Sequence, residues 1–207
     1  AMHSFYSNKN QPFAKADYTI FVAEVASTCN EILLSEYLRE QYAGNKQAQI
    51  ALIGSLLQHF RTTVFRQTMF AEFEKRIHEK MAEEGTLTAD GISELYLSIN
   101  KEYFGPDMIS DPQIALEWAR IPHFYYNYYV FQYSTGFSAA MALSERILSE
   151  GEPAVKDYLN FLSGGCSKDP ISLLQGAGVD MRTAEPVHRA LKLFDSLLDE
   201  MEALMEA

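Results

Sequence analysis

The stretch KQAQIALIGSLLQHFRTTVFRQTMFAEFEKRIHEKMA, residues 46–82, decides the fold class. Its apolar residues recur every three to four positions, which is the period of one face of an α-helix. We therefore expect one long helix here, ended by Gly85, because glycine readily adopts the left-handed conformation that closes a helix. The apolar stripe consists of Ile50, Ile53, Leu57, Val64, Phe65, Phe70, Phe73 and Ile77.

The same helical spacing extends to both sides of this stretch. We expect further helices over residues 17–42, 90–104, 122–150, 152–162 and from about 184 to the C-terminus, with a shorter turn at 170–175. Asp17 is the expected N-cap of the first and Gly44 its stop. No stretch alternates apolar and polar residues as a strand does, and no heptad is sustained. The sequence predicts an all-α fold, a multi-helix bundle, with residues 1–207 as a single helical domain.

Composition and charge indicate a folded protein and argue against nucleic-acid binding and a membrane span. The chain of 207 residues is 47% hydrophobic and carries 17 Lys and Arg against 28 Asp and Glu, for a net charge of −11. That hydrophobic content suffices for a folded core. The acidic balance argues against nucleic acid as a partner, because binding phosphates requires clustered Lys and Arg. No apolar run reaches the roughly 18 residues of a membrane span.

The two cysteines, Cys29 and Cys166, are too few for a disulfide framework or a metal cage. They suit a reducing compartment, and residues 1–12 lack the apolar core of a signal peptide. We therefore predict a cytoplasmic protein. Neither cysteine has a histidine or basic cluster beside it in the sequence that would activate the thiol.

Glu24 and Glu31 form the first candidate constellation. Seven residues are close to two helical turns, so both carboxylates would lie on nearly one face of a helix, among the apolar neighbours Phe21, Val22, Val25 and Ile32. A carboxylate buried there needs a cationic partner or a metal ion. In the alternative interpretation, both glutamates lie at the border of the helix and face water.

The second constellation is IPHFYYNYYVFQY, residues 121–133, which holds five tyrosines and a histidine. In a continuous helix, Tyr126, Tyr129 and Tyr133 would form one stripe, and Tyr125, Tyr128 and Gln132 another. Phenol and imidazole donors that face a cleft can stabilise an oxyanion. The alternative is an aromatic helix face whose hydroxyls reach water.

The third constellation is the loop SGGCS, residues 163–167. Adjacent glycines let the backbone approach a ligand closely, but they are equally ordinary between two helices. The sequence contains neither a GxxxxGK[ST] phosphate loop nor a GxSxG motif. His59, His78 and His188 are expected on polar, solvated helix faces.

Segments along nearly the whole chain resemble oligoendopeptidase F, a family of thimet-oligopeptidase-like zinc metallopeptidases. They occur in the order expected for the family. The segments are AMHSFY (1–6), NQP (10–12), FVAEVAST (21–28), NE (30–31), IPHFY (121–125), QYSTG (132–136), SGG (163–165) and AGVD (177–180).

The chain departs from the family pattern at one important point. In the family, an HExxH helix directly precedes the residues that match Ala1 to Ser4. This motif supplies two zinc-binding histidines one turn apart and a glutamate that acts as general base. The 207 residues contain no HExxH. The resemblance therefore implies a C-terminal fragment of a zincin-type oligopeptidase that begins just after the motif.

The resemblance also implies roles for individual residues. Glu24 matches the downstream metal ligand of the family, and Glu31 matches an acidic position expected to orient a ligand. His123 matches a histidine in the aromatic segment of the family. Tyr125 and Tyr129 are the expected phenol donors to the oxyanion, and Tyr128 is a further candidate.

The resemblance also bears on Phe131, Gly164 and Gly165. Phe131 stands where relatives can carry a tyrosine, so the choice among the phenols stays open. Gly164 and Gly165 would lie against the peptide backbone of a substrate.

The implied function is zinc-dependent hydrolysis of short peptides in a channel between helical halves. Zn²⁺ would be bound in the intact enzyme, and the partners would be peptide substrates and the N-terminal part that carries HExxH. We expect the isolated chain to bind zinc weakly and to be inactive, because one ligand does not make a site. Two alternatives are a non-catalytic acidic helical module that binds a peptide or partner helix, and a small-molecule sensor that uses the tyrosine-rich segment.

Overall fold

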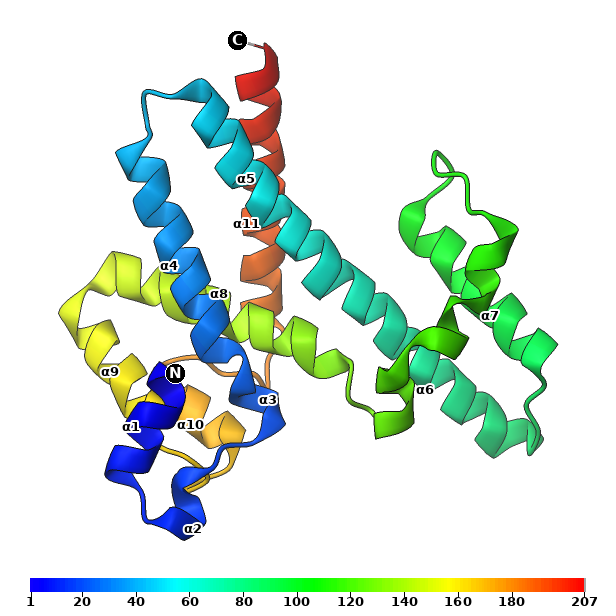
Figure 1. Cartoon of the computed structure of the whole chain (residues 1–207), viewed down its shortest axis with the longest axis horizontal. Helices are drawn as coiled ribbons and strands as arrows, with labels where there is room; N and C mark the ends of the chain where they lie inside the picture. Colours follow the sequence, from blue (N-terminus) through cyan, green and yellow to red (C-terminus); the bar gives the residue numbers. More distant parts are fainter. Residues whose placement is uncertain (207) are drawn as a thin grey trace. The chain divides into compact units, whose positions relative to one another are not determined.

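The computed structural model describes residues 1–206, and none of them lies in a β-strand (Figure 1). The predicted all-α fold is confirmed. The chain forms two compact units: residues 1–61 with 135–206 make the first unit, and residues 62–134 make the second. Within residues 1–206, no helix combines the length and the hydropathy that a bilayer crossing requires.

The long helices of the first unit pack around α5. Helix α5 contacts α4 and α11, which run beside it in Figure 1. Phe60, at the end of α5, lies edge-on to Phe137 and also contacts Phe194, and it is fully buried. The helices of this unit are α1 (Met2–Asn10), α2 (Phe13–Ala16), α3 (Ile20–Ala23), α4 (Val25–Gln41), α5 (Lys46–Phe60), most of α8 (Phe131–Glu150), α9 (Glu152–Leu162), α10 (Pro170–Gly176) and α11 (Glu185–Glu206).

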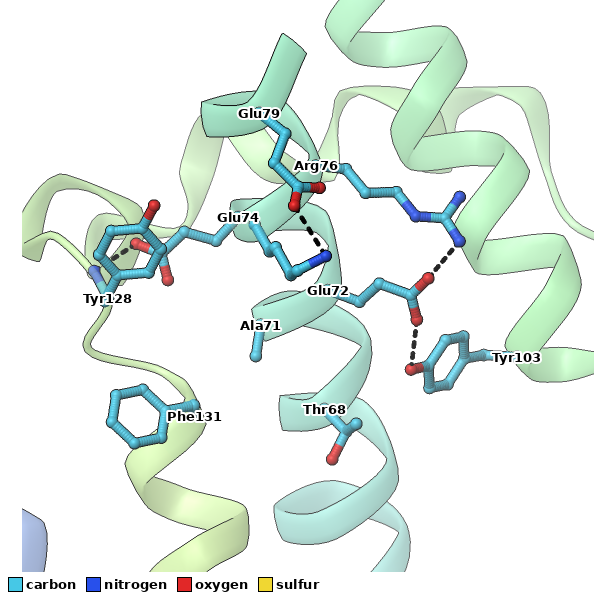
Figure 2. A pocket seen from close by; sticks show the side chains of 10 residues that line it. Thr68, Ala71, Glu72, Glu74, Arg76, Glu79, Tyr103, Tyr128 and Phe131 are labelled. Atoms are coloured by element: carbon cyan, nitrogen blue, oxygen red, sulfur yellow. Dashed lines mark hydrogen bonds and ion pairs between the residues drawn. The ribbon is translucent and has the colours of Figure 1, made fainter. Parts of the chain in front are cut away.

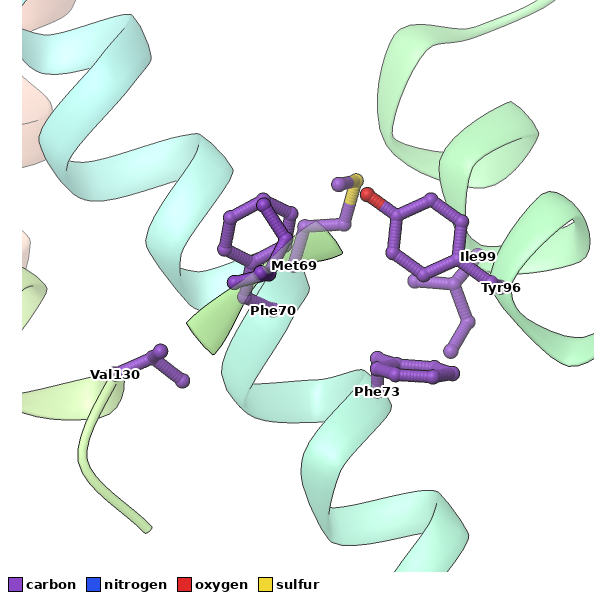
Figure 3. Packing of buried hydrophobic residues seen from close by; sticks show 7 residues of the cluster. Met69, Phe70, Phe73, Tyr96, Ile99 and Val130 are labelled. Carbon is purple, nitrogen blue, oxygen red and sulfur yellow. The ribbon is translucent and has the colours of Figure 1, made fainter. Parts of the chain in front are cut away.

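The second unit is built on two antiparallel helices, α6 (Arg66–Glu84) and α7 (Ala89–Phe104). Phe73 of α6 lies edge-on to Tyr96 of α7 at 5.0 Å between ring centroids, inside a cluster of buried apolar side chains (Figure 3). Two 3₁₀ segments, η2 (Pro112–Arg120) and η3 (Pro122–Tyr126), follow α7.

A buried carboxylate fixes η2 to the helices of the second unit. Glu117 accepts a hydrogen bond from the Tyr96 hydroxyl at 2.6 Å and from Arg66 at 2.6 Å, and Arg120 also pairs with it. Burial alone would raise the pKa of Glu117, but these donors bring it below its ordinary value. The carboxylate is therefore held ionised within the unit.

The long helix expected over residues 46–82 is interrupted. A π-helical turn, η1 (Arg61–Phe65), separates α5 from α6 at the point where the chain passes from the first unit to the second. Such turns insert one extra residue per turn and shift the apolar stripe around the axis. The predicted stop at Gly85 is confirmed: its φ is 71°, and its N–H donates to the Met81 carbonyl.

The helix predicted over residues 17–42 is wrong at its start. The Asp17 side chain accepts a hydrogen bond from the N–H of Tyr18 rather than capping a helix, Asp17 and Thr19 are extended, and α3 begins only at Ile20. Aspartate side chains compete with helical hydrogen bonds in this way. Glu24 then separates α3 from α4, since its N–H bonds to the Val22 carbonyl instead of extending the α-helical ladder.

The helix predicted to run from Pro122 to Glu150 is also wrong at its start. After η3, Asn127 and Tyr128 have φ angles of 43° and 57°, and α8 begins only at Phe131. Asparagine tolerates this left-handed conformation, whereas tyrosine rarely adopts it. The tyrosines of this segment therefore do not share one continuous helix.

Candidate active site

The aromatic segment brings His123 together with two of its tyrosines. The imidazole of His123 stacks on the ring of Tyr129 at 5.5 Å between centroids. Its Nε2 lies 3.3 Å from the Tyr133 hydroxyl oxygen, and the rings of Tyr129 and Tyr133 meet edge to face. All three side chains are partly exposed. We call these three residues the His123 cluster.

The other tyrosines of the segment lie elsewhere. Tyr126 touches the ring of Tyr129, so the predicted stripe of Tyr126, Tyr129 and Tyr133 is present as a chain of ring contacts despite the broken helix. Tyr125 is 76% exposed. Tyr128 stacks instead on His78 of α6, at 4.7 Å between centroids. Of the predicted phenol donors, Tyr129 is thus the one in ring contact with His123.

A pocket of about 610 Å³ opens within the second unit, beside α6 (Figure 2). It falls in the size range of small-ligand sites. Most charges along it are already paired: Glu72 with Arg76 and the Tyr103 hydroxyl, and Lys75 with Glu79. The lining residues are Thr68, Ala71, Glu72, Glu74, Lys75, Arg76, Glu79, Tyr103, Tyr128 and Phe131.

Glu74 differs from the other acidic residues of this pocket, because its side chain is buried with only 1% exposed. Its Oε1 accepts a hydrogen bond from the backbone N–H of Tyr128 at 2.7 Å. Burial raises the pKa of Glu74, and the Tyr128 N–H and the nearby His78 oppose that rise. A buried carboxylate of this kind needs its backbone partner, since without one it would be left unsatisfied.

Glu24 and Glu31 lie in the first unit, at the start and in the middle of α4, and both are exposed. The Oε2 atom of Glu31 lies 3.9 Å from Nδ1 of His59. The interpretation in which both face water therefore fits the structure better than burial among apolar residues. Their roles toward a metal stay predictions.

A carboxylate oxygen is a suitable zinc ligand, but a zinc site takes three or four protein ligands. Within residues 1–206, no group of three or more His, Cys, Asp or Glu side chains is arranged to hold a metal ion. Glu24 thus fits as one ligand of a site, and the described residues do not complete that site.

Gly164 and Gly165 are buried and pack against their own unit. A Cβ on Gly165 would collide with the carbonyl oxygen of Lys15, and the φ of 52° at this residue also favours glycine. The N–H of Cys166 donates to the same carbonyl at 2.9 Å. Close packing of the loop on α2 accounts for Gly165, and contact with a substrate backbone stays a prediction.

The sequence also predicted the environments of the two cysteines and of His59 and His188. Cys29 is buried, which raises the pKa of its thiol to about 12 and favours the neutral thiol over the thiolate. Cys166 is exposed. His188 is exposed as expected, whereas His59, half-buried, lies edge-on to the ring of Phe137.

Sequence reasoning missed two residues near the aromatic segment. The sequence pattern puts Tyr133 in an aromatic stripe but does not predict its hydrogen bond with His123. It does not single out Glu74 either, although Glu74 follows Phe73 and lies four residues after Phe70, on the apolar stripe of its helix. A glutamate on such a stripe indicates a buried, partnered carboxylate.

Comparison with known proteins matches the chain to one family. Residues 1–193 match the model of Peptidase family M3. Oligopeptidase PepF of Bacillus subtilis (strain 168) is 54% identical over 205 residues, which are 99% of this chain and 30% of that protein. The chromosomal oligoendopeptidase F of Lactococcus lactis subsp. cremoris is 43% identical over 206 residues, which are 100% of this chain and 34% of that protein.

A solved structure has the same fold. The crystal structure of oligoendopeptidase-F from Enterococcus faecium superposes with a TM-score of 0.87 at 43% identity, covering 99% of this chain and 37% of that one. The chain thus spans about a third of the length of the curated relatives it matches.

Proposed function

Because the chain belongs to Peptidase family M3, we propose that it works as part of a zinc-dependent oligoendopeptidase that hydrolyses short peptides. The observation that carries this proposal is the 54% identity to an oligopeptidase over 99% of the chain. At that level of identity, the fold and the site chemistry of two proteins are ordinarily shared.

In this proposal, Glu24 is one zinc ligand and Glu31 orients the ligand set. The other ligands would come from an HExxH motif in polypeptide outside these 207 residues, since the sequence contains none. Zinc bound there would polarise the scissile carbonyl and activate a water molecule. The exposure of Glu24 supports this role, because its carboxylate is free to meet ligands from another segment.

The residues of this chain would act on the oxyanion that forms at the scissile carbonyl. His123 and the phenols of Tyr129, Tyr125 and Tyr128 would donate hydrogen bonds to it. The ring contact of Tyr129 with His123 supports these two as neighbouring donors. The loop at Gly164 and Gly165 would lie along the substrate backbone.

The test uses the full-length protein that contains this chain. It is incubated with a short internally quenched peptide, and separately with a folded protein substrate, before and after treatment with a zinc chelator. The proposal predicts cleavage of the peptide alone, loss of cleavage with the chelator and recovery on adding Zn²⁺. Peptide binding without cleavage under all of these conditions would instead support a non-catalytic binding module.

A further inference from the structure

The chain makes an unfavourable turn just before Tyr129. Asn127 and Tyr128 both have left-handed φ angles, 43° and 57°, and neither is glycine. Two consecutive residues of this kind persist only when surrounding contacts hold them. The turn follows η3, which carries His123, and directly precedes Tyr129.

Two side chains of α6 contact Tyr128 from different directions. The Glu74 carboxylate accepts a hydrogen bond from the backbone N–H of Tyr128 at 2.7 Å (Figure 2). The ring of His78 stacks on the Tyr128 ring with 29° between the planes. Glu74 and His78 are four residues apart, so they lie one turn apart on the same face of α6. We call Glu74 and His78 the Tyr128 clamp.

The hydrogen bond that the Tyr128 N–H donates to Glu74 replaces a helical one. In a continuous helix, the Tyr128 N–H would bond to a carbonyl four residues earlier. Here a carboxylate 54 positions away takes that place, and Glu74 itself is buried, with 1% of its surface exposed. The left-handed turn is therefore fixed by a contact that only the folded second unit provides.

From this geometry we propose that Glu74 is a positioning residue for catalysis, with His78 as its helper. The clamp holds the turn at Tyr128 and so fixes the backbone direction at Tyr129. That direction in turn determines how the Tyr129 ring stacks on His123. The proposal rests on the proposed function, because it assumes that the His123 cluster serves the reaction. Neighbouring acidic residues do not share this role: Glu72 and Glu79 are paired with Arg76 and Lys75.

The experiment compares three variants of the full-length protein. Glu74→Met removes the acceptor while keeping the side-chain length, and Glu74→Gln keeps an acceptor oxygen but removes the charge. Glu79→Met is the matched control, since it makes the same change on the same helix at an exposed ion pair, which contributes little. The readouts are kcat and KM for a short quenched peptide, and hydrogen exchange of the backbone segment that contains Tyr128.

The clamp predicts a specific pattern. Glu74→Met should lower kcat on the order of 10- to 100-fold with KM within about twofold, because small displacements of catalytic groups have effects of this size. The Tyr128 segment should also exchange faster. Glu74→Gln should stay within about threefold of the wild-type kcat, because the Tyr128 N–H keeps its acceptor. Glu79→Met should resemble the wild type in both readouts.

Each other outcome contradicts a defined part of the proposal. Unchanged exchange in Glu74→Met would show that the clamp does not hold the turn. Faster exchange with an unchanged kcat would show that the turn is held but does not position catalytic groups. If the wild-type protein cleaves no peptide, the proposed function and the catalytic role of Glu74 both fail, while exchange still decides whether the clamp exists.

Discussion

The Tyr133 hydroxyl oxygen lies 3.3 Å from Nε2 of His123, and the two rings meet edge to face with their centroids 5.8 Å apart. His123 lies in η3 and Tyr133 in the first turn of α8, so this contact joins the two ends of the aromatic segment. One nitrogen of the imidazole is thereby held toward a phenol, which fixes the orientation of the ring.

Substituting Tyr133 by Phe in the full-length enzyme should therefore lower kcat on the order of 10-fold, because the His123 ring loses the hydroxyl that orients it. KM should change little. Tyr37→Phe is the matched control, since Tyr37 lies on α4 and is 57% exposed. Steady-state kinetics with a short peptide measure both. An unchanged kcat in Tyr133→Phe would show that this contact does not orient a working histidine.

Glu24→Gln in the full-length enzyme should reduce zinc affinity more than Glu31→Gln does. A direct ligand contributes its charge to the ion, whereas a group that orients a ligand contributes roughly 10- to 100-fold in affinity. Zinc per protein molecule, measured by elemental analysis after dialysis, gives the comparison. Glu40→Gln, also exposed and on α4, serves as the control. Equal loss of zinc from Glu24→Gln and Glu31→Gln would contradict the ligand role of Glu24.

The 207-residue chain by itself should bind zinc weakly and cleave no peptide. Glu24 is a single ligand, and residues 1–206 hold no group of three or more potential ligands around a common point. Isothermal titration with Zn²⁺ and a fluorogenic peptide assay test the two parts. Tight binding of one zinc per chain, or cleavage that a chelator abolishes, would show that the chain completes a metal site by itself.

His3 makes the 207-residue chain less stable in mild acid. It is buried, it stacks on Tyr18, and burial together with the nearby N-terminal charge lowers its pKa from 6.5 to about 4. Below pH 6.5 the unfolded chain takes up a proton at this site, and the folded chain does not until the pH falls to about 4. Stability is therefore lost as the pH falls through this range.

His3→Phe keeps the stacking and removes the titration. The slope approaches about 1.4 kcal/mol per pH unit only below pH 6.5. The wild-type chain should therefore lose roughly 1.5 kcal/mol between pH 6.5 and pH 5 that the variant keeps. Denaturant unfolding at the two pH values measures the difference. A parallel loss in both proteins would show that His3 does not control the acid sensitivity.

Most helix ends were predictable because their signals are local. Gly85 and Gly105 end α6 and α7 with positive φ angles, and α9 spans residues 152–162 as expected, with Pro153 in its first turn. Glycine and proline act through their own backbone restrictions, so no knowledge of distant contacts is needed. The all-α class follows from the same local patterns.

The break at Asn127 and Tyr128 could not be predicted in this way. The helical spacing of the aromatic residues continues through it, and the contact that stabilises the turn comes from Glu74, 54 residues earlier. For the same reason, the composition marked the whole aromatic segment as a candidate, and the family resemblance favoured Tyr125 and Tyr129 over Tyr128. Neither shows that Tyr129 meets His123 while Tyr128 faces His78. Which tyrosine meets the histidine depends on tertiary contacts.

In the proposed function, the His123 cluster stabilises a transition state rather than a hydrophobic core. The most direct measurement determines kcat, KM, zinc content and melting temperature of His123→Ala and Tyr129→Phe in the full-length enzyme, with Tyr125→Phe alongside. Tyr→Phe removes only the hydroxyl, so ring packing is kept. If the His123 cluster stabilises the transition state, kcat should fall by about 10²–10³-fold in His123→Ala and Tyr129→Phe, with KM, zinc content and melting temperature nearly unchanged. Normal kcat with a lower melting temperature in both variants would contradict this role and assign these residues to packing alone.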